Sequence, residues 1–468
     1  MIEDYAAEGK CIAKWNGKVV FVENCVPGDI VNVQLSKNKK DWAEAIPLSF
    51  VEYSAERVKP FCNHFGICGG CRWQMLPYEK QLFYKQKQVS DNLTRIGKIP
   101  LPKIMPIIGC DNNTHYRNKL EYTFANKKFI AEVEYRKLMN EQLDIKVLAK
   151  KNVAGFHAKG VFDKVVEIEE CFLQQEPTNA LRNSIAAYAR QNNFSFYDIW
   201  KHEGWLRNMM VRLCTTGELM LNIIIGYEDK PAMENLFQHI LTNFPQVSTL
   251  LFTINPKHND SIYDLSPQVY YGKGFITEKL GDFTFKIGAK SFFQTNTKQA
   301  GKLYNITKDF AELDGSQVLY DLYCGTGSIG IFVSGQAKKI IGVETIAEAV
   351  ADAKENAALN SINHASFFSG DVIDICNTDF FEANGNPDVI ITDPPRAGMH
   401  AKLVEKLLEI EAPLIVYVSC NPATQARDLN LLGEKYSVEK IQPVDMFPHT
   451  HHIENVVQLK LRNPNPHP

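Results

Sequence analysis

Two residues near the C-terminal end of the chain could together perform covalent chemistry. Cys420, in VYVSCNPATQARDL, follows an apolar run that predicts a buried strand, and Glu454, in MFPHTHHIENVV, stands at the entrance of the last predicted strand. A cysteine at the C-terminal edge of a sheet, close to a helix start and to Arg396, is expected to have a lowered pKa and to act as a nucleophile. Glu454 could remove a proton as a general base. A buried structural thiol is the alternative for Cys420.

Three histidines close to Glu454 offer a second interpretation of the same segment. His449, His451 and His452 could be metal ligands, but no cysteine or carboxylate stands at a spacing that would complete such a site. We therefore prefer a carboxylate base at Glu454.

A glycine loop precedes these residues in the chain. DLYCGTG, from Asp321 to Gly327, follows an apolar strand and opens a helix, which is the context of a nucleotide-type site. Glu344 ends the next strand, where it could accept hydrogen bonds from both ribose hydroxyls, and Asp371 closes the strand after that. Strand ends of an open α/β sheet converge on one ligand crevice. A dinucleotide is the alternative, but DxxxGxG is more similar to the S-adenosylmethionine loop of Rossmann-like methyltransferases.

A proline-rich turn ends a further predicted strand. TDPPRAG places Asp393 before two prolines and Arg396. Because proline fixes φ, the turn is rigid, and its carboxylate and carbonyls can face a planar base. The related D/N-P-P motif of amino-group methyltransferases usually ends in an aromatic residue, whereas here an arginine follows and Cys420 lies downstream.

These groups fit one reaction on uracil. The C5 carbon of uracil is a poor nucleophile, and addition of a thiolate to C6 turns the ring into an enolate that can attack a sulfonium methyl group. A base must then remove the C5 proton so that the thiolate can be eliminated. Cys420 and Glu454 could supply these two functions, and no metal is needed. The target uridine must be unpaired or flipped out of its stack.

A second group of cysteines lies far upstream. CNHFGICGGC places Cys62, Cys68 and Cys71 within ten residues, whereas most of the eleven cysteines are scattered. An odd, scattered set does not indicate a disulfide framework. C-x5-C-x2-C with a remote fourth cysteine could hold either zinc or an iron-sulfur cluster. The spacing argues against a radical S-adenosylmethionine enzyme, which uses C-x3-C-x2-C.

The elements that must position these residues divide into three parts. The chain has 468 residues, enough for several domains. Residues 1–58 read as a five-stranded β-barrel, residues 59–290 as a central α+β domain, and residues 291–468 as a doubly wound α/β domain. The tail NPNPHP looks disordered.

Charge and hydropathy give weaker indications. The net charge of -3 does not indicate a generally basic, nucleic-acid-binding protein, so local basic patches must decide. One such patch contains Lys37, Lys39 and Lys40, which could bind RNA phosphates or could simply be solvated surface lysines. The N-terminus is acidic and no apolar run approaches the roughly 18 residues of a spanning helix. We expect a cytoplasmic, monomeric protein that does not contact membranes.

The motifs together resemble a known family. SFFQTN, DLYCGTGSIG, DPPRAG, VSCNPAT and FPHTHHIENV, in this order across about residues 291–458, are similar to the RNA uracil-5-methyltransferases. The resemblance implies that Cys420 is the nucleophile and Glu454 the general base. Ser328 stands where close relatives frequently have asparagine. The residues that the resemblance places around S-adenosylmethionine are Gln294, Tyr323, Gly325, Ser328, Glu344, Asp371 and Asp393.

The N-terminal part carries two further resemblances. Residues 1–58 resemble the TRAM domain, an RNA-binding barrel, and CNHFGICGGC followed by EIEECFLQ is similar to the cysteine pattern of the ribosomal RNA branch. This implies that Cys62, Cys68, Cys71 and Cys171 hold one [4Fe-4S] cluster. The transfer RNA branch generally lacks both the barrel and this cysteine set, which favours 23S ribosomal RNA as the substrate.

Three residues are expected near the RNA. The likeness of THYRNKLEYTF to a family segment that approaches substrate places Arg117 and Lys119 there, and Phe293 could stack on a base. The alternatives are a transfer RNA uracil-5-methyltransferase, a cytosine-5 methyltransferase, and a non-catalytic RNA-binding or chaperone protein. Retention of Cys420, Glu454 and the glycine loop argues against the last.

Overall fold

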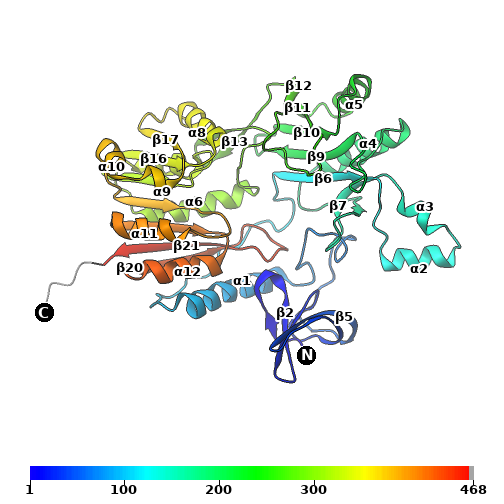
Figure 1. The fold of residues 1–468 in the computed structure, drawn as a ribbon, viewed down its shortest axis with the longest axis horizontal. Helices are drawn as coiled ribbons and strands as arrows, with labels where there is room; N and C mark the ends of the chain where they lie inside the picture. Colours follow the sequence, from blue (N-terminus) through cyan, green and yellow to red (C-terminus); the bar gives the residue numbers. More distant parts are fainter. Residues whose placement is uncertain (463–468) are drawn as a thin grey trace.

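The computed structural model describes residues 1–462, and the tail for which the sequence indicates disorder lies outside this range. Figure 1 shows an α/β unit formed by the C-terminal part and a mixed sheet formed by the central part, with the N-terminal sheet next to α1. Among the described helices, none has the length and apolarity needed to cross a bilayer.

The N-terminal unit is a five-stranded sheet with the order β1-β2-β3-β5-β4. Ile2 N donates to Asp29 O (2.8 Å) and Gly28 N donates to Ile2 O (2.9 Å), directly before the edge strand β4. The residues that precede the two edge strands, β1 and β4, are thereby hydrogen bonded to each other, and the five predicted strands form one sheet. Its strands are β1 (Asp4–Tyr5), β2 (Cys11–Trp15), β3 (Lys18–Val22), β4 (Ile30–Asn38) and β5 (Trp42–Glu52).

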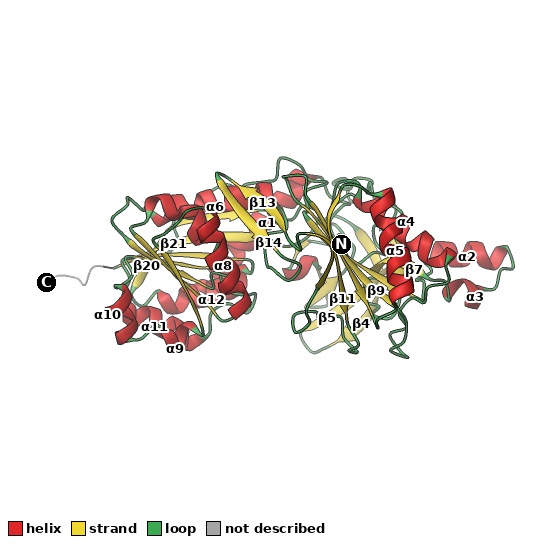
Figure 2. Cartoon of the chain, turned by 90° about the horizontal axis from the view of Figure 1, so that it is seen from above, coloured by secondary structure: helices red, strands yellow, loops and turns green. Residues whose placement is uncertain are grey.

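The central unit is a seven-stranded mixed sheet with the order β12-β11-β10-β9-β6-β7-β8. Helices α4 and α5 share one apolar core with this sheet, whereas α2 and α3 project away from the rest of the molecule (Figures 1 and 2). The strands are β6 (Lys119–Ala125), β7 (Val153–His157), β8 (Val165–Glu167), β9 (Leu206–Leu213), β10 (Leu219–Ile225), β11 (Val247–Ile254) and β12 (Gln268–Gly272). The helices are α2 (Glu132–Asn140), α3 (Ile145–Ala149), α4 (Thr178–Gln191) and α5 (Lys230–Asn243).

Two connecting pieces dock on the C-terminal unit. Helix α1 (Tyr78–Asn92) and the π-helical turn Leu93–Gly97 bury Val89 and Leu93 in one of its cores. The hairpin of β13 (Ile276–Leu280) and β14 (Phe283–Ile287) lies on helix α8 (Ala347–Leu359), where Lys286 N donates to Asn356 Oδ1 (2.8 Å). Segments from the central part of the chain therefore help to build the C-terminal core.

The C-terminal unit is a seven-stranded sheet with the order β17-β16-β15-β18-β19-β21-β20. Strands β15 to β19 are parallel, and β21 is inserted antiparallel between β19 and β20. The strands are β15 (Val318–Leu322), β16 (Lys339–Glu344), β17 (Ala365–Ser369), β18 (Val389–Thr392), β19 (Leu414–Ser419), β20 (Tyr436–Val444) and β21 (Glu454–Leu461). The helices are α6 (Thr297–Ala311), α7 (Ser328–Val333), α8 (Ala347–Leu359), α9 (Val372–Ile375), α10 (Thr378–Asn384), α11 (Ala401–Ile410) and α12 (Pro422–Leu432).

This sheet has a separate apolar core on each face. Along β15, Leu319 points into the core that contains α6, α7 and α8, while Tyr320 and Leu322 point into the core that contains α1, α11 and α12. Alternate residues of a strand face opposite sides, so nearly continuous apolar strands such as LIVYVS serve both cores. The predicted doubly wound fold is confirmed.

Candidate functional site

The parallel strands deliver most of the expected site residues to one edge of the C-terminal sheet. Tyr323 follows β15, Glu344 is the last residue of β16, Asp371 follows β17, Asp393 follows β18 and Cys420 follows β19. Because these strands are parallel, their carboxyl ends lie on the same edge, which is where open α/β sheets bind ligands.

Glu454 reaches this edge from the opposite direction. β21 runs antiparallel to β19 with Ser419 paired to Asn455, so the next residues outward are Cys420 and Glu454. Glu454 is buried, with 6% of its surface exposed, and Cys420 is half-buried. The pairing brings the two residues with expected chemical roles side by side, although the chain separates them by a helix and a strand.

Three carboxyl groups, those of Asp321, Asp393 and Glu454, lie at this edge and are largely buried from solvent. Burial raises the pKa of Asp321 to about 7, and burial likewise raises the pKa of Asp393 to about 7. Burial, and then the charge of Asp393, raises the pKa of Glu454 well above its usual value, while Arg396 opposes the shift. A glutamate with a raised pKa is a stronger base than one in water.

The expected lowering of the Cys420 pKa is wrong for the ligand-free protein. Burial, Glu454 and Asp393 together raise the pKa of the thiol to about 12, and Arg396 only partly offsets them. The start of α12 does follow Cys420, with Asn421 as its N-cap. Arg396 is the cationic side chain whose charge favours the thiolate form of Cys420.

The glycine loop has the backbone geometry of a binding loop. Tyr323 (φ 61°), Gly325 (φ 53°) and Gly327 (φ 75°) are all left-handed, and for tyrosine this conformation is strained. Gly325 N donates to Glu344 Oε2 (3.1 Å), and a Cβ on Gly325 would meet no atom within 4 Å. The Gly325 backbone thus borders open space, whereas Gly327 is packed between Ala353 and Phe367.

The other residues expected around the cofactor lie close to this loop. The Ser328 hydroxyl hydrogen bonds to the Tyr304 hydroxyl (2.8 Å), and the Phe292 carbonyl accepts from Thr326 Oγ1 (3.3 Å), which brings the segment containing Gln294 to the loop. The stacking role expected for Phe293 is wrong, because Phe293 is buried in the core against Phe285. Its neighbour Phe292 is 69% exposed.

The three histidines serve the loop between β20 and β21. His449 is buried and hydrogen bonds to Gln81, and the ring of His452 lies 3.1 Å from Arg396 Nη2. Burial lowers the pKa of His449 and His451 to about 4 and that of His452 to about 3, so all three are neutral. Among residues 1–462, no three or more His, Cys, Asp or Glu side chains form a group that could hold a metal ion.

The four upstream cysteines line one cavity. Cys62, Cys68, Cys71 and Cys171 all border a space of about 350 Å³, far more than the ~10–15 Å³ that one water needs. Burial, with the neighbouring thiols contributing, raises the pKa of Cys68 to about 12 and of Cys71 to about 11. Cys171 comes from the loop before α4, where its N–H donates to Asn179 Oδ1 (2.8 Å).

The basic residues expected near RNA lie at two places. Arg117 and Lys119 border the cysteine cavity, and the Arg117 guanidinium lies 5.1 Å from the ring of Phe447 in the loop before Glu454. In the N-terminal sheet, Lys37 Nζ lies 4.9 Å from the ring centre of Trp42, where exposed lysines border the turn between β4 and β5.

Comparison with known proteins decides the family. Residues 267–462 match the family profile described as tRNA (Uracil-5-)-methyltransferase, and residues 1–48 match the TRAM domain. An uncharacterized RNA methyltransferase of Bacteroides thetaiotaomicron is 51% identical over 460 residues, which cover 98% of this chain and 100% of the relative. The chain belongs to the RNA uracil-5-methyltransferase family. An uncharacterized RNA methyltransferase of Porphyromonas gingivalis is 45% identical over 462 residues, 98% of each chain.

A solved structure extends the similarity to the whole fold of this RNA uracil-5-methyltransferase. The tRNA (uracil-54, C5)-methyltransferase of Pyrococcus abyssi, in complex with S-adenosyl-L-homocysteine, superposes with a TM-score of 0.75 at 27% identity, covering 98% of this chain and 99% of that chain. The chain is thus an S-adenosylmethionine-dependent RNA (uracil-5-)-methyltransferase with an N-terminal TRAM domain.

Sequence reasoning missed two features of the site. The first is the structural part played by Asp321, the first residue of the glycine loop. Asp321 is buried and accepts a hydrogen bond from Gly330 N (2.9 Å). The buried ion pair of Lys85 and Asp445 joins α1 to the loop before Glu454. No local signal could reveal that pair, because its two members stand 360 positions apart.

Proposed function

We propose that this enzyme forms 5-methyluridine in 23S ribosomal RNA with Cys420 as nucleophile and Glu454 as general base. The observation that carries the assignment of these two residues is the β19–β21 register, which brings them together at the ligand-binding edge of the sheet. The nearby histidines have lowered pKa values and are poor proton acceptors, whereas the pKa of Glu454 is raised, which favours Glu454 as the base in this loop.

Each residue has one task in the reaction. Cys420 Sγ forms a bond to C6 of uracil, and the electron pair of the C5–C6 double bond moves into an enolate. S-adenosylmethionine supplies the electrophilic methyl group that C5 takes up. Glu454 then takes the proton from C5, the enolate re-forms, and the Cys420–C6 bond breaks to release 5-methyluridine. Arg396, whose charge opposes the raised pKa of both groups, stabilises Cys420 as the departing thiolate.

The cofactor residues fall into two groups. The left-handed loop at Tyr323 and Gly325 offers backbone to a ligand that approaches closely, and Glu344 and Asp371 present carboxylates at the ends of the next two strands. We assign the binding of S-adenosylmethionine to Gln294, Tyr323, Gly325, Ser328, Glu344, Asp371 and Asp393.

The cysteine cavity is assigned to a [4Fe-4S] cluster held by Cys62, Cys68, Cys71 and Cys171. The support for this proposal is that four thiols, the ligand type of such clusters, border one roomy cavity. As the side chains lie among residues 1–462, these thiols are not yet gathered into a metal-holding group, so binding would have to draw them together. A single zinc ion would draw the sulfur atoms to about 2.3 Å from one point. When bound, the cluster supplies positive charge that keeps the four thiols deprotonated, and it ties the loop 62–71 to the segment before α4.

The choice of ribosomal RNA rests on these cysteines. The N-terminal sheet does not separate the candidate substrates, because the Pyrococcus abyssi enzyme, named for its action on transfer RNA, aligns with 98% of this chain. That whole-chain similarity favours transfer RNA as the second candidate substrate. In either case the TRAM domain and its lysine-bordered turn are assigned to binding the RNA backbone.

One experiment separates these substrates. The protein is incubated with tritiated S-adenosylmethionine and with transcripts of 23S ribosomal RNA or of transfer RNA, and the products are digested to nucleosides. We expect labelled 5-methyluridine from the ribosomal transcript. Label from transfer RNA alone would move the substrate to the second candidate, and label in 5-methylcytidine would overturn the reaction.

The cluster has a separate test. After anaerobic purification, iron and acid-labile sulfide should each approach four per chain, as the [4Fe-4S] composition requires. Stoichiometric zinc without sulfide would overturn the assignment while leaving the methyl-transfer chemistry intact.

A further inference from the structure

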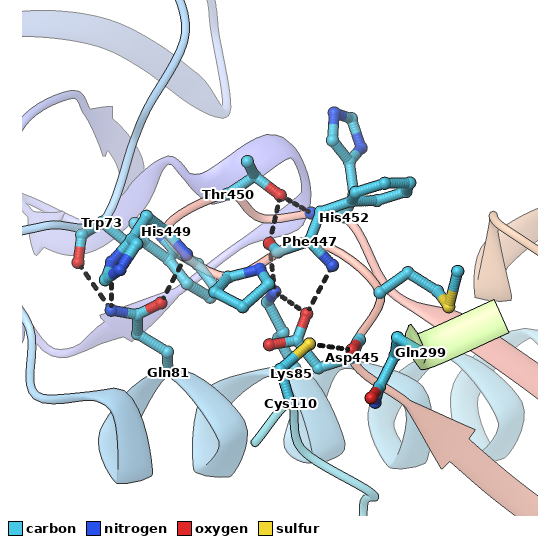
Figure 3. A network of polar contacts seen from close by, with 12 residues as sticks. Trp73, Gln81, Lys85, Cys110, Gln299, Asp445, Phe447, His449, Thr450 and His452 are labelled. Atoms are coloured by element: carbon cyan, nitrogen blue, oxygen red, sulfur yellow. Dashed lines mark hydrogen bonds and ion pairs between the residues drawn. The ribbon is translucent and has the colours of Figure 1, made fainter. Parts of the chain in front are cut away.

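The loop between β20 and β21, residues 445–453, ends at the proposed base and is held by helix α1 (Figure 3). Lys85 Nζ lies 2.6 Å from Asp445 Oδ1 and donates to Phe447 O (3.1 Å), and both Lys85 and Asp445 are fully buried. Tyr78 OH donates to Asp445 Oδ2 (2.8 Å). A buried carboxylate with these partners fixes the start of the loop, because an unpaired charge there would be costly.

Gln81, one helical turn before Lys85, fixes the middle of the loop. Its Oε1 accepts from His449 N (2.8 Å), and its Nε2 lies 3.1 Å from His449 Nδ1 (Figure 3). His449 is left-handed, with φ 63°. A residue other than glycine keeps such a conformation only where its surroundings dictate it. The two contacts of Gln81 therefore help to hold the path of the chain into Glu454.

The cysteine segment contacts the same residue. Arg72 N (2.7 Å) and Trp73 N (3.1 Å), directly after Cys71, both donate to His449 O. The loop before the base is therefore fixed by segments that lie before the C-terminal domain in the chain.

The nucleophile is positioned differently. Asn421 N donates to Ser419 Oγ (3.1 Å), and Asn421 Nδ2 donates to Arg396 O (2.9 Å), so the turn at Cys420 is held by contacts within its own domain. Arg396 links the two sides, because its Nη2 also lies 3.1 Å from His452 Nδ1, but the contacts that Lys85 and Gln81 make with the loop before the base do not include the turn at Cys420.

We propose that Lys85 and Gln81 are positioning residues for Glu454. When they are lost, removal of the C5 proton slows more than thiol addition and methyl transfer, and the enzyme stays covalently attached to its RNA. This inference rests on the proposed roles of Cys420 and Glu454.

The test compares two RNAs. RNA that contains 5-fluorouridine carries no proton at C5, so its stable adduct reports addition and methyl transfer without the base. RNA with ordinary uridine requires the base for release.

The variants are Lys85→Met and Gln81→Leu, and Gln81→Leu leaves no buried charge unpaired. Lys87→Met, whose side chain pairs at the surface with Asp4 and Asp91, and Gln88→Leu are the matched controls on α1.

We expect both test variants to form the 5-fluorouridine adduct within about twofold of the wild-type rate, and to turn over ordinary RNA more than about tenfold more slowly. The covalent complex with ordinary RNA should accumulate as in Glu454→Gln, and the controls should behave as wild type. A parallel fall of both rates in Gln81→Leu, or unchanged turnover, would overturn the inference. Absence of the adduct in the wild-type enzyme would instead refute the proposed function.

Discussion

The two thiol sites of this enzyme have raised thiol pKa values for different reasons. At the sheet edge, Cys420 is next to Glu454 and Asp393, and these carboxylates add to the effect of burial. In the central cavity, Cys68 is surrounded by other cysteines, whose charges add to the effect of burial. At both sites the nearby arginine only partly offsets the raised pKa of the thiol, and for each site a cationic ligand is proposed above. The proposed ligands differ: a sulfonium at one site and an iron-sulfur cluster at the other.

The two sites also differ in how the chain assembles them. The sheet edge is built from residues at strand ends, each fixed by the register of its strand. The four cysteines of the cavity come from a loop before α1 and a loop before α4, although residues of β6 and β7 also line it. We therefore expect the first site to survive loss of its thiol without a change in fold, and the second to lose local order.

The largest expected effect is that of Cys420→Ser. Methyl transfer should fall by at least about 10⁴-fold, because no other group can form the bond to C6. Incorporation of tritium from S-adenosylmethionine into RNA measures the rate. Thermal unfolding should be unchanged, and Cys376→Ala, at a buried cysteine away from the edge, should keep full activity. Retention of more than a hundredth of the activity in Cys420→Ser would contradict the covalent mechanism.

Glu454→Gln should have the second-largest effect. Turnover is expected to fall about 10²–10⁴-fold, the range for loss of a general base, while one round of methyl transfer still occurs. A covalent protein–RNA complex with ordinary uridine should therefore build up on denaturing gels. If turnover falls without any build-up of complex, Glu454 acts before methyl transfer, and the proposed order of steps is wrong.

Most of the catalytic edge could be predicted from the sequence, but its charge balance could not. The glycine loop, TDPPR and VSCNP each indicate the end of a predicted strand. Because the strands are parallel, these ends lie at the same edge of the sheet. The pairing of β21 between β19 and β20 joins Cys420 to Glu454, and no local pattern encodes that insertion. Of the two carboxylates that raise the Cys420 pKa, Glu454 arrives by this pairing, whereas Asp393 follows β18, the parallel neighbour of β19. Phe293 and Phe292 are neighbours in sequence, and only packing decides which one is exposed.

Cys71→Ala tests the second thiol site, the cysteine cavity of the central unit. Loss of one of the four proposed cluster ligands should lower iron content by at least about tenfold, since even outer contacts of a metal site matter that much. The loop with Arg72 and Trp73 should loosen, so the covalent RNA complex should also accumulate. Iron and sulfide analysis with gel assay checks both. Full iron content in Cys71→Ala would remove Cys71 from the ligand set.

The last expected effect concerns the pH dependence of one thiol and leaves the rate of methylation aside. In the ligand-free enzyme a Cys420 pKa of about 12 keeps the thiol protonated at neutral pH. The thiolate fraction, and with it the rate of alkylation by iodoacetamide, should rise about tenfold for each pH unit from 7 to 10. Peptide mass spectrometry follows Cys420 alone. A rate that levels off near pH 8 would show that the carboxylates do not control this thiol.

The most direct test of the central claim is to locate the covalent bond itself. Enzyme, S-adenosylmethionine and 5-fluorouridine RNA are combined, the product is digested with nuclease and protease, and the modified peptide is sequenced by mass spectrometry. We expect a methylated fluorouridine attached to Cys420 in the peptide that contains VSCNPAT. Attachment at any other cysteine, or no attachment during active methylation of ordinary RNA, would contradict the account.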